Sequence, residues 1–99
     1  MVTYIITFRK RASKEYLATI DWYKDQSFQA CENFIETIQS ALKFIADSPY
    51  TYRNSYKNFR EFKIKKFPFT VVYLVDEEKQ FVIITSIFHN KRNPAKKFR

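Results

Sequence analysis

One histidine and one arginine stand three residues apart near the C-terminal end of the chain, in the stretch His-Asn-Lys-Arg-Asn-Pro at 89–94. The imidazole of His89 could take up or release a proton near neutral pH, and the guanidinium of Arg92 could give two parallel hydrogen bonds to a phosphate or carboxylate. Each residue also has a structural interpretation. His89 could hydrogen-bond the end of a strand, and Arg92 could form an ion pair within the chain, for which Glu61 is the obvious partner.

Arg60 is a second cation that could take part in such chemistry. Cleavage of RNA through its own 2′-hydroxyl needs a base, a cation for the developing charge and an acid for the leaving oxygen. Arg60, His89 and Arg92 could supply these parts. Because Arg60 is the first residue of a predicted strand, we expect it to lie beside the end of a neighbouring strand and close to His89.

Basic and aromatic side chains form the other candidate surface. A lysine stripe follows one predicted strand, and the irregular segment before it mixes tyrosines with cations, so phosphate contacts and base stacking are both conceivable. The candidate residues for binding a nucleic acid or another target are Lys63, Lys65, Lys66, Tyr52, Arg53, Tyr56 and Lys91. The structural alternatives are a solvated face for the lysines and packing at the rim of a sheet for the tyrosines, and we favour packing for the tyrosines.

The net charge of the chain is concentrated in its second half. Residues 1–47 carry six Lys and Arg against six Asp and Glu, whereas residues 48–99 carry twelve against four, so the formal charge of +8 comes from the C-terminal part. A basic face built on strands suits a polyanion or an acidic protein partner.

Composition excludes several classes of protein. The 99 residues suffice for a single domain, 1–99, with one core. Cys31 is the only cysteine, so no disulfide forms within the chain and we expect a reducing compartment, by default the cytoplasm. The N-terminus has no signal-peptide or membrane-spanning pattern. Without glycine there is no phosphate-binding glycine loop, and one histidine with one cysteine cannot form a zinc site, so we expect no cofactor and no metal.

The elements that must position these residues are predicted from periodicity. Residues 2–8 are β-branched and aromatic, as in a strand. Ser13 is a plausible N-cap for a first helix. A second helix follows from the i, i+3, i+4, i+7 spacing of apolar residues over 31–45, and Pro49 stops it. The short connection predicts an antiparallel hairpin, and we interpret Trp22 as packing within it, together with the cysteine.

Three further strands are predicted over 60–65, 69–75 and 81–88, the last two separated by a polar turn. The order of elements is therefore β-α-α-β-β-β. It predicts an α+β domain in which the N-terminal strand and the helical hairpin pack on a mainly antiparallel four-stranded sheet.

The segments 60–73 and 82–94 resemble the C-terminal half of the RelE/ParE superfamily of bacterial toxins. The resemblance rests on an Arg…Phe-Pro-Phe…Tyr pattern followed by His-x-x-Arg-x-Pro, and the N-terminal strand and helical hairpin with Trp22-Tyr23 also fit. It implies a small toxin encoded with an antitoxin, whose acidic or amphipathic segment covers the basic face. The charge asymmetry suits such a partner.

The superfamily divides by mechanism. RelE-like members cut messenger RNA in the ribosome, and ParE-like members inhibit DNA gyrase by binding. Arg60 matches both branches, and His89 with Arg92 matches an ending associated more with ParE-like members. Phe98 stands where some ribonuclease members place a tyrosine, and it cannot exchange a proton. The resemblance therefore favours gyrase inhibition, with ribosome-dependent mRNA cleavage as the enzymatic alternative and general nucleic-acid binding as the third.

Overall fold

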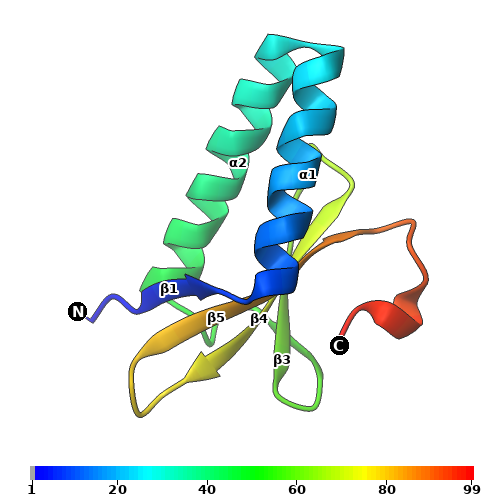
Figure 1. Ribbon diagram of the computed structural model, residues 1–99. Coiled ribbons are helices and arrows are strands. Elements are labelled where there is room, and N and C mark those ends of the chain that lie inside the picture. The colour runs from blue at the N-terminus through cyan, green and yellow to red at the C-terminus, as the bar shows by residue number, and fades with distance from the viewer. Residues whose placement is uncertain (1) are drawn as a thin grey trace.

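Two antiparallel helices stand on one face of a five-stranded sheet in the computed structural model, which describes residues 2–99 (Figure 1). Helix α1 spans Lys10–Gln26 and helix α2 spans Phe28–Asp47. Ser27 separates them, and its side chain caps α2 by accepting a hydrogen bond of 3.2 Å from the Ala30 N–H. The predicted hairpin is confirmed, and neither helix is long and apolar enough to cross a membrane.

Helix α1 begins three residues before the predicted N-cap. Its cap is Arg9, so the prediction of Ser13 as the cap is wrong. Sheet pairing explains the early start, because the Arg9 N–H still bonds to the Ile84 carbonyl at 2.9 Å and the next residue already belongs to the helix. Ser13 therefore lies inside the first turn of α1 and cannot cap it.

The sheet has the order β1-β5-β4-β3-β2. Strand β1 runs parallel to β5, and the other neighbours are antiparallel. The bounds are Ile5–Phe8 for β1, Arg53–Tyr56 for β2, Phe59–Lys63 for β3, Phe69–Asp76 for β4 and Phe81–His89 for β5. The predicted α+β class is confirmed, but β2 adds a strand to the four that were predicted. Because β2 is an edge strand with little burial on either side, it carries no alternating apolar pattern.

The hairpin turns are made without glycine. Lys57 follows β2 with φ of 51°, and Gln80 precedes β5 with φ of 56°. Both lie in the left-handed region, where a side chain is disfavoured. The strands therefore have to hold these two turns in place.

The core lies between α2 and the sheet. Its fully buried members include Phe34, Ile38 and Ile45 from α2 and Val71, Tyr73 and Ile84 from the central strands. Burial raises the pKa of the Tyr73 hydroxyl, which donates a 2.6 Å hydrogen bond to the Pro49 carbonyl. Cys31 is buried in the hairpin, as predicted.

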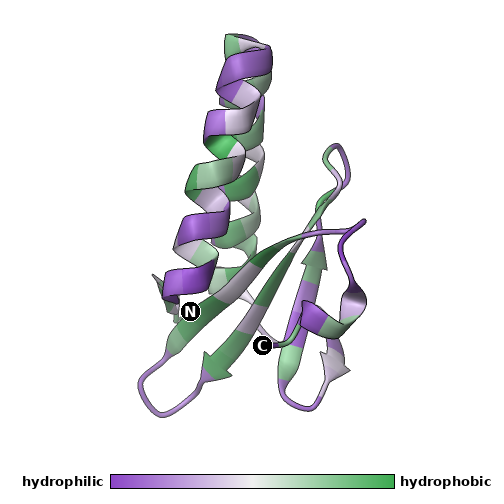
Figure 2. Ribbon diagram, turned by 45° about the vertical axis from the view of Figure 1, so that its right-hand side comes forward, coloured by the Kyte–Doolittle hydropathy of each residue, from purple (hydrophilic) through white to green (hydrophobic). Residues whose placement is uncertain are grey.

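The C-terminal tail folds back across the face of the sheet that the helices leave open (Figure 2). After a short 3-10 helix at Pro94–Lys96, the Lys97 ammonium donates to the Glu61 carboxylate at 3.1 Å. The Phe98 ring stacks on Tyr56 with centroids 5.2 Å apart. The molecule thus has three layers: helices, sheet and tail.

Candidate functional site

The predicted site residues are divided between opposite ends of the sheet. Arg60 on β3 is paired with Tyr73, and Tyr73 is paired with Ile84, five residues before the end of β5. His89, the last residue of β5, is paired with Phe69. The prediction that Arg60 lies close to His89 is therefore wrong. Strands β3 and β5 both run antiparallel to β4, so they run in the same direction, and their register through β4 places Arg60 level with Ile84 and away from His89.

At the Arg60 end, the guanidinium is held by the chain itself. Its Nη1 donates to the Tyr50 carbonyl at 3.2 Å and to the Tyr52 carbonyl at 2.8 Å, and the group lies 5.0 Å from the centroid of the Tyr50 ring. Such contacts position the loop between α2 and β2. Arg60 therefore has a structural role at this end of the sheet, where it holds the loop between α2 and β2.

The same loop is tied to the β4–β5 turn by a carboxylate. The hydroxyls of Tyr4 and Tyr50 both donate to Glu77. The hydrogen bond to this carboxylate raises the pKa of Tyr50 to about 12, and the bonds from the two tyrosines lower the pKa of Glu77. The cluster joins the N-terminal segment, the loop and the turn.

At the His89 end, the imidazole has a defined hydrogen-bonding state. Its Nδ1 accepts the Lys91 N–H at 3.1 Å, and its ring meets Phe69 edge to face at a centroid distance of 4.9 Å. Because Nδ1 acts as the acceptor, the neutral ring carries its proton on Nε2. While this hydrogen bond holds, Nε2 can donate a hydrogen bond but cannot accept a proton.

Arg92 pairs with a carboxylate, as its structural alternative predicted, but the partner is not Glu61. Its Nη1 donates to Glu15 Oε2 at 2.7 Å, and Arg11 Nε donates to the same oxygen at 3.2 Å. The Arg92 side chain remains 44% exposed. Glu61 is occupied by Lys97 instead, on the tail side of the sheet.

Glu15 also completes the edge of β5. Strand β1 ends opposite Ile84, so the rest of β5 has no strand on that side. The other carboxylate oxygen, Oε1, accepts the Ile87 N–H at 3.1 Å and the Ser86 hydroxyl at 2.8 Å. Sequence reasoning missed this role, because Glu15 lies 72 residues before Ile87 and only the crossing of α1 brings them together.

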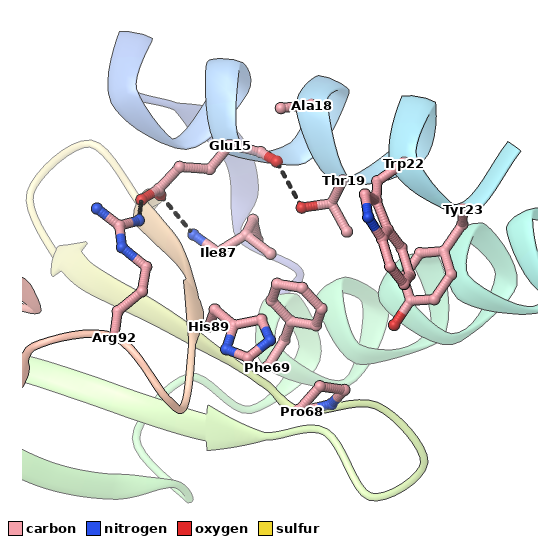
Figure 3. Close-up of a pocket in the computed structure, with 10 residues that line it drawn as sticks. All are labelled: Glu15, Ala18, Thr19, Trp22, Tyr23, Pro68, Phe69, Ile87, His89 and Arg92. Atoms are coloured by element: carbon pink, nitrogen blue, oxygen red, sulfur yellow. Dashed lines mark hydrogen bonds and ion pairs between the residues drawn. The ribbon is translucent and has the colours of Figure 1, made fainter. Parts of the chain in front are cut away.

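A pocket of about 510 Å³ lies between α1 and the His89 end of the sheet (Figure 3). Figure 3 shows Trp22 on the α1 side and Phe69 with His89 on the sheet side, with Arg92 at one end. We call it the Trp22 slot. Trp22 is 58% exposed, so its interpretation as a residue packed within the hairpin is wrong. Trp22 does not share the helical spacing of Tyr16, Ile20 and Tyr23, which pack on the core, and it projects from the neighbouring face of α1.

Several lysines lie near the His89 end. The β3–β4 loop, which holds Lys65 and Lys66, is joined to the turn after β5 by the bond from the Asn90 N–H to the Pro68 carbonyl, at 2.9 Å. Lys91 lies in that turn, and all three lysines are exposed. Lys63, also exposed, ends β3 on the same side and lines a second groove with Lys65, Lys66 and Phe44 of α2.

The tyrosine segment lies away from the Trp22 slot. Tyr52 packs on Phe62 with ring centroids 4.7 Å apart, as the packing alternative predicted. Tyr56 stacks on Phe98, and Arg53 is exposed at the start of β2. These residues flank the outer edge of the sheet, whereas the Trp22 slot lies between α1 and the end of β5. Tyr52 also lines the second groove with Lys63, Lys65 and Lys66. Within residues 2–99, Tyr52 therefore lies with the lysines, whereas Tyr56 and Arg53 lie apart from them on the outer strand.

The arrangement is better suited to binding than to acid–base catalysis. Of the three residues predicted for RNA cleavage, Arg60 is remote from the other two and bonded to main-chain carbonyls. His89 presents a donor, and the charge of Arg92 is partly neutralised by Glu15. What remains at the His89 end is an aromatic pocket with exposed cations around it.

Several solved structures share this fold, among them the three that follow. The ParDE toxin–antitoxin system of P. aeruginosa matches with a TM-score of 0.74 at 15% identity, over 88% of this chain and 96% of that chain. The intact E. coli RelBE complex matches with 0.58 at 20% identity, over 90% and 99%. A mutant of E. coli RelE in the free state matches with 0.62 at 20% identity, over 90% and 85%. No curated protein sequence matches.

A family model adds what the fold alone does not give. The model described as the ParE toxin of the type II toxin–antitoxin system, parDE, matches residues 6–94. That range contains both helices, the whole sheet except Ile5 at the start of β1, and the His-x-x-Arg-x-Pro stretch. The chain therefore belongs to the ParE toxin family of type II toxin–antitoxin systems, within the RelE/ParE superfamily.

Proposed function

We propose that this protein arrests growth by binding and inhibiting DNA gyrase, as ParE-like toxins do, and that a cognate antitoxin neutralises it. The observation that carries the proposal is the separation of Arg60 from His89 and Arg92 by the direction of the strands. An acid–base mechanism needs its cation, base and acid around one substrate atom. A binding mechanism needs only an exposed, charged surface.

The state of His89 supports the same proposal. With Nδ1 engaged by the Lys91 N–H, the neutral imidazole can act as a hydrogen-bond donor and not as a base at Nε2. The match to the ParE family model and the fold shared with the ParDE system are in accord with a ParE-like activity.

Ribosome-dependent cleavage of messenger RNA is the second candidate. It is favoured by the cations beside the imidazole, since Lys91 is exposed and Arg92 is 44% exposed. A protonated His89 beside these cations could act as the acid for the leaving oxygen, with the cations holding the phosphate.

His89→Gln distinguishes the two candidates. Glutamine keeps an N–H donor but transfers no proton, so we expect growth arrest and inhibition of gyrase supercoiling to persist within a few-fold of the native toxin. Primer extension on translated messages should show no cleavage with either protein. Cleavage at ribosome-bound codons that disappears in His89→Gln would overturn the gyrase proposal.

The antitoxin is expected to present an acidic or amphipathic segment to the basic C-terminal half. Its gene should lie directly beside the toxin gene, and co-expression should restore growth. Replacing Lys65, Lys66 and Lys91 by alanine should weaken the complex and reduce its dependence on salt, because exposed charge pairs are screened by ions. The control is Lys43→Ala on α2, outside the charged half, which should leave the affinity within twofold. An unchanged affinity in the triple variant would contradict this part of the proposal.

A further inference from the structure

Trp22 is the single tryptophan of the chain, and more than half of its surface is open to solvent. An exposed indole is a large apolar surface with a polar N–H at its edge, a combination that is frequent at binding sites. Trp22 meets the Tyr23 ring edge to face at a centroid distance of 5.0 Å, but the contacts of α1 with the core are made by Tyr16, Ile20 and Tyr23.

The surroundings of Trp22 form a built pocket. The Trp22 slot is aromatic on both sides, with Trp22 and Tyr23 from α1 facing Phe69 and His89 from the sheet (Figure 3). Its volume of about 510 Å³ lies in the range of small-molecule sites, roughly 300–1,000 Å³. His89 contributes an Nε2–H donor, because its Nδ1 accepts the Lys91 N–H. The slot thus offers flat apolar walls and a polar group that could orient a ring.

Positive charge lies at the sheet side of the slot. Arg92 lines it, Lys91 is the neighbouring residue, and Lys66 precedes Pro68 of the lining by two positions. Glu15 offsets part of the Arg92 charge, but the C-terminal half carries twelve basic against four acidic residues. A nucleotide combines a flat aromatic ring with negative charge, so its chemistry fits this slot.

We propose that the Trp22 slot binds one unpaired base of a single-stranded nucleic acid, which stacks on the Trp22 indole while Lys91 and Arg92 contact the adjacent phosphates. A base within a duplex presents only its edges, whereas this slot requires an exposed ring face. An acidic peptide without apolar side chains could satisfy the cations, but it would not match the aromatic walls. The site is independent of the proposed function, since it requires neither gyrase nor a ribosome.

Tryptophan fluorescence tests the site directly, because the signal comes from Trp22 alone. Titration with an oligothymidylate about eight nucleotides long should give saturable quenching. The affinity should fall with salt, by about 0.7 units of log K per unit of log salt concentration for each phosphate contact. A duplex of the same length should bind at least tenfold more weakly. Equal binding of duplex and single strand would overturn the proposal.

Variants locate the binding to the slot. Trp22→Leu should lower the affinity for a labelled oligonucleotide roughly ten- to a hundredfold, measured by anisotropy. Ala18→Phe fills the slot from α1 while keeping the indole, and it should have a similar effect. The matched control is Phe44→Leu, an aromatic residue 57% exposed in the other groove, which should stay within twofold.

Lys91→Ala tests the phosphate contact. It should reduce the salt slope by about 0.7 and leave the extent of quenching at saturation unchanged. A Trp22→Leu protein that binds within twofold of the native chain, or quenching by an acidic peptide and not by the oligonucleotide, would overturn the assignment. Failure of these tests would leave gyrase inhibition, which is measured by supercoiling, untouched.

Discussion

The two ends of the sheet use arginine for different purposes. At one end, Arg60 donates to two main-chain carbonyls and lies against the Tyr50 ring. At the other end, Arg92 meets a carboxylate and keeps 44% of its side chain exposed among other cations. The Arg60 guanidinium, which donates to main-chain oxygens, stabilises the fold. The Arg92 guanidinium, which stays nearly half exposed, can still contact a partner. Residue type alone does not distinguish these tasks.

Removing the Glu15 carboxylate should have the largest effect on stability. It accepts hydrogen bonds from four groups of the described chain, and only 13% of its side chain is exposed. Glu15→Ala leaves the Ile87 N–H and two arginines without their acceptor, so we expect the free energy of unfolding to fall by about 3 kcal/mol. Urea denaturation followed by circular dichroism measures this change.

Asp21→Ala is the matched control, because this acidic residue is exposed on the same helix. Its effect should be within about 0.5 kcal/mol. Glu15→Gln should be intermediate, since the amide keeps an oxygen for the strand edge but loses the charge that pairs with Arg92. Equal effects of Glu15→Ala and Asp21→Ala would show that the His89 end does not depend on this carboxylate.

Arg60→Ala and Arg92→Ala test the comparison of the two ends directly. Arg60→Ala should destabilise the protein by about 2 kcal/mol, because two hydrogen bonds to a charged group are lost. Arg92→Ala should cost about 1 kcal/mol or less, as exposed ion pairs do, yet it should reduce growth arrest at least tenfold. Arg60→Ala should keep growth arrest at a temperature where it is folded. If instead Arg60→Ala were folded but inactive, the two arginines would share one task.

Much of the fold could be predicted from the sequence because the patterns were local. The apolar spacing over 31–45 predicted α2, and the continuous apolar runs predicted β4 and β5. Strand β2 was missed because it is an edge strand, with few buried side chains to set a period. Ser13 was wrongly predicted as the N-cap of α1. The pairing of β1 with β5 continues to the Arg9 N–H, and the helix begins at the next residue.

The site was harder to predict because it depends on contacts between distant segments. The pairing of Arg92 with Glu15 joins residues 77 positions apart, and no local pattern marks it. The sequence predicted that Arg60 lies close to His89, but it does not give the direction and register of the strands. These place Arg60 level with Ile84, away from His89. The charge asymmetry was local information: it predicted a basic second half of the chain, of which Lys65, Lys66 and Lys91 lie exposed near the His89 end. That this surface binds a partner stays a prediction.

The smallest expected effect concerns Glu61, which lies between the two ends under the C-terminal tail. Burial raises the pKa of its carboxyl, but hydrogen bonds from Ser55 and Lys97 and the charges of Lys97 and Arg53 outweigh this, so its pKa lies below the ordinary value. A lowered folded-state pKa stabilises the protein above the ordinary glutamate pKa of about 4.3. This contribution is lost as the pH falls through the lower folded-state value.

Lys97→Ala should therefore reduce the free energy of unfolding at pH 7 by about 1 kcal/mol and make the loss of stability between about pH 5 and pH 3 shallower. Urea denaturation at several pH values measures both effects. Part of the acid dependence should persist, because the pKa of Glu77 at the Arg60 end is lowered by Tyr50 and Tyr4 and not by the tail. Lys96, the last residue of the short 3-10 helix, is exposed beside Lys97, and Lys96→Ala should leave the profile unchanged. If both lysine variants gave the same profile, the ion pair of Lys97 with Glu61 would not contribute to stability. The C-terminal tail would then not stabilise the sheet between its two ends through this contact.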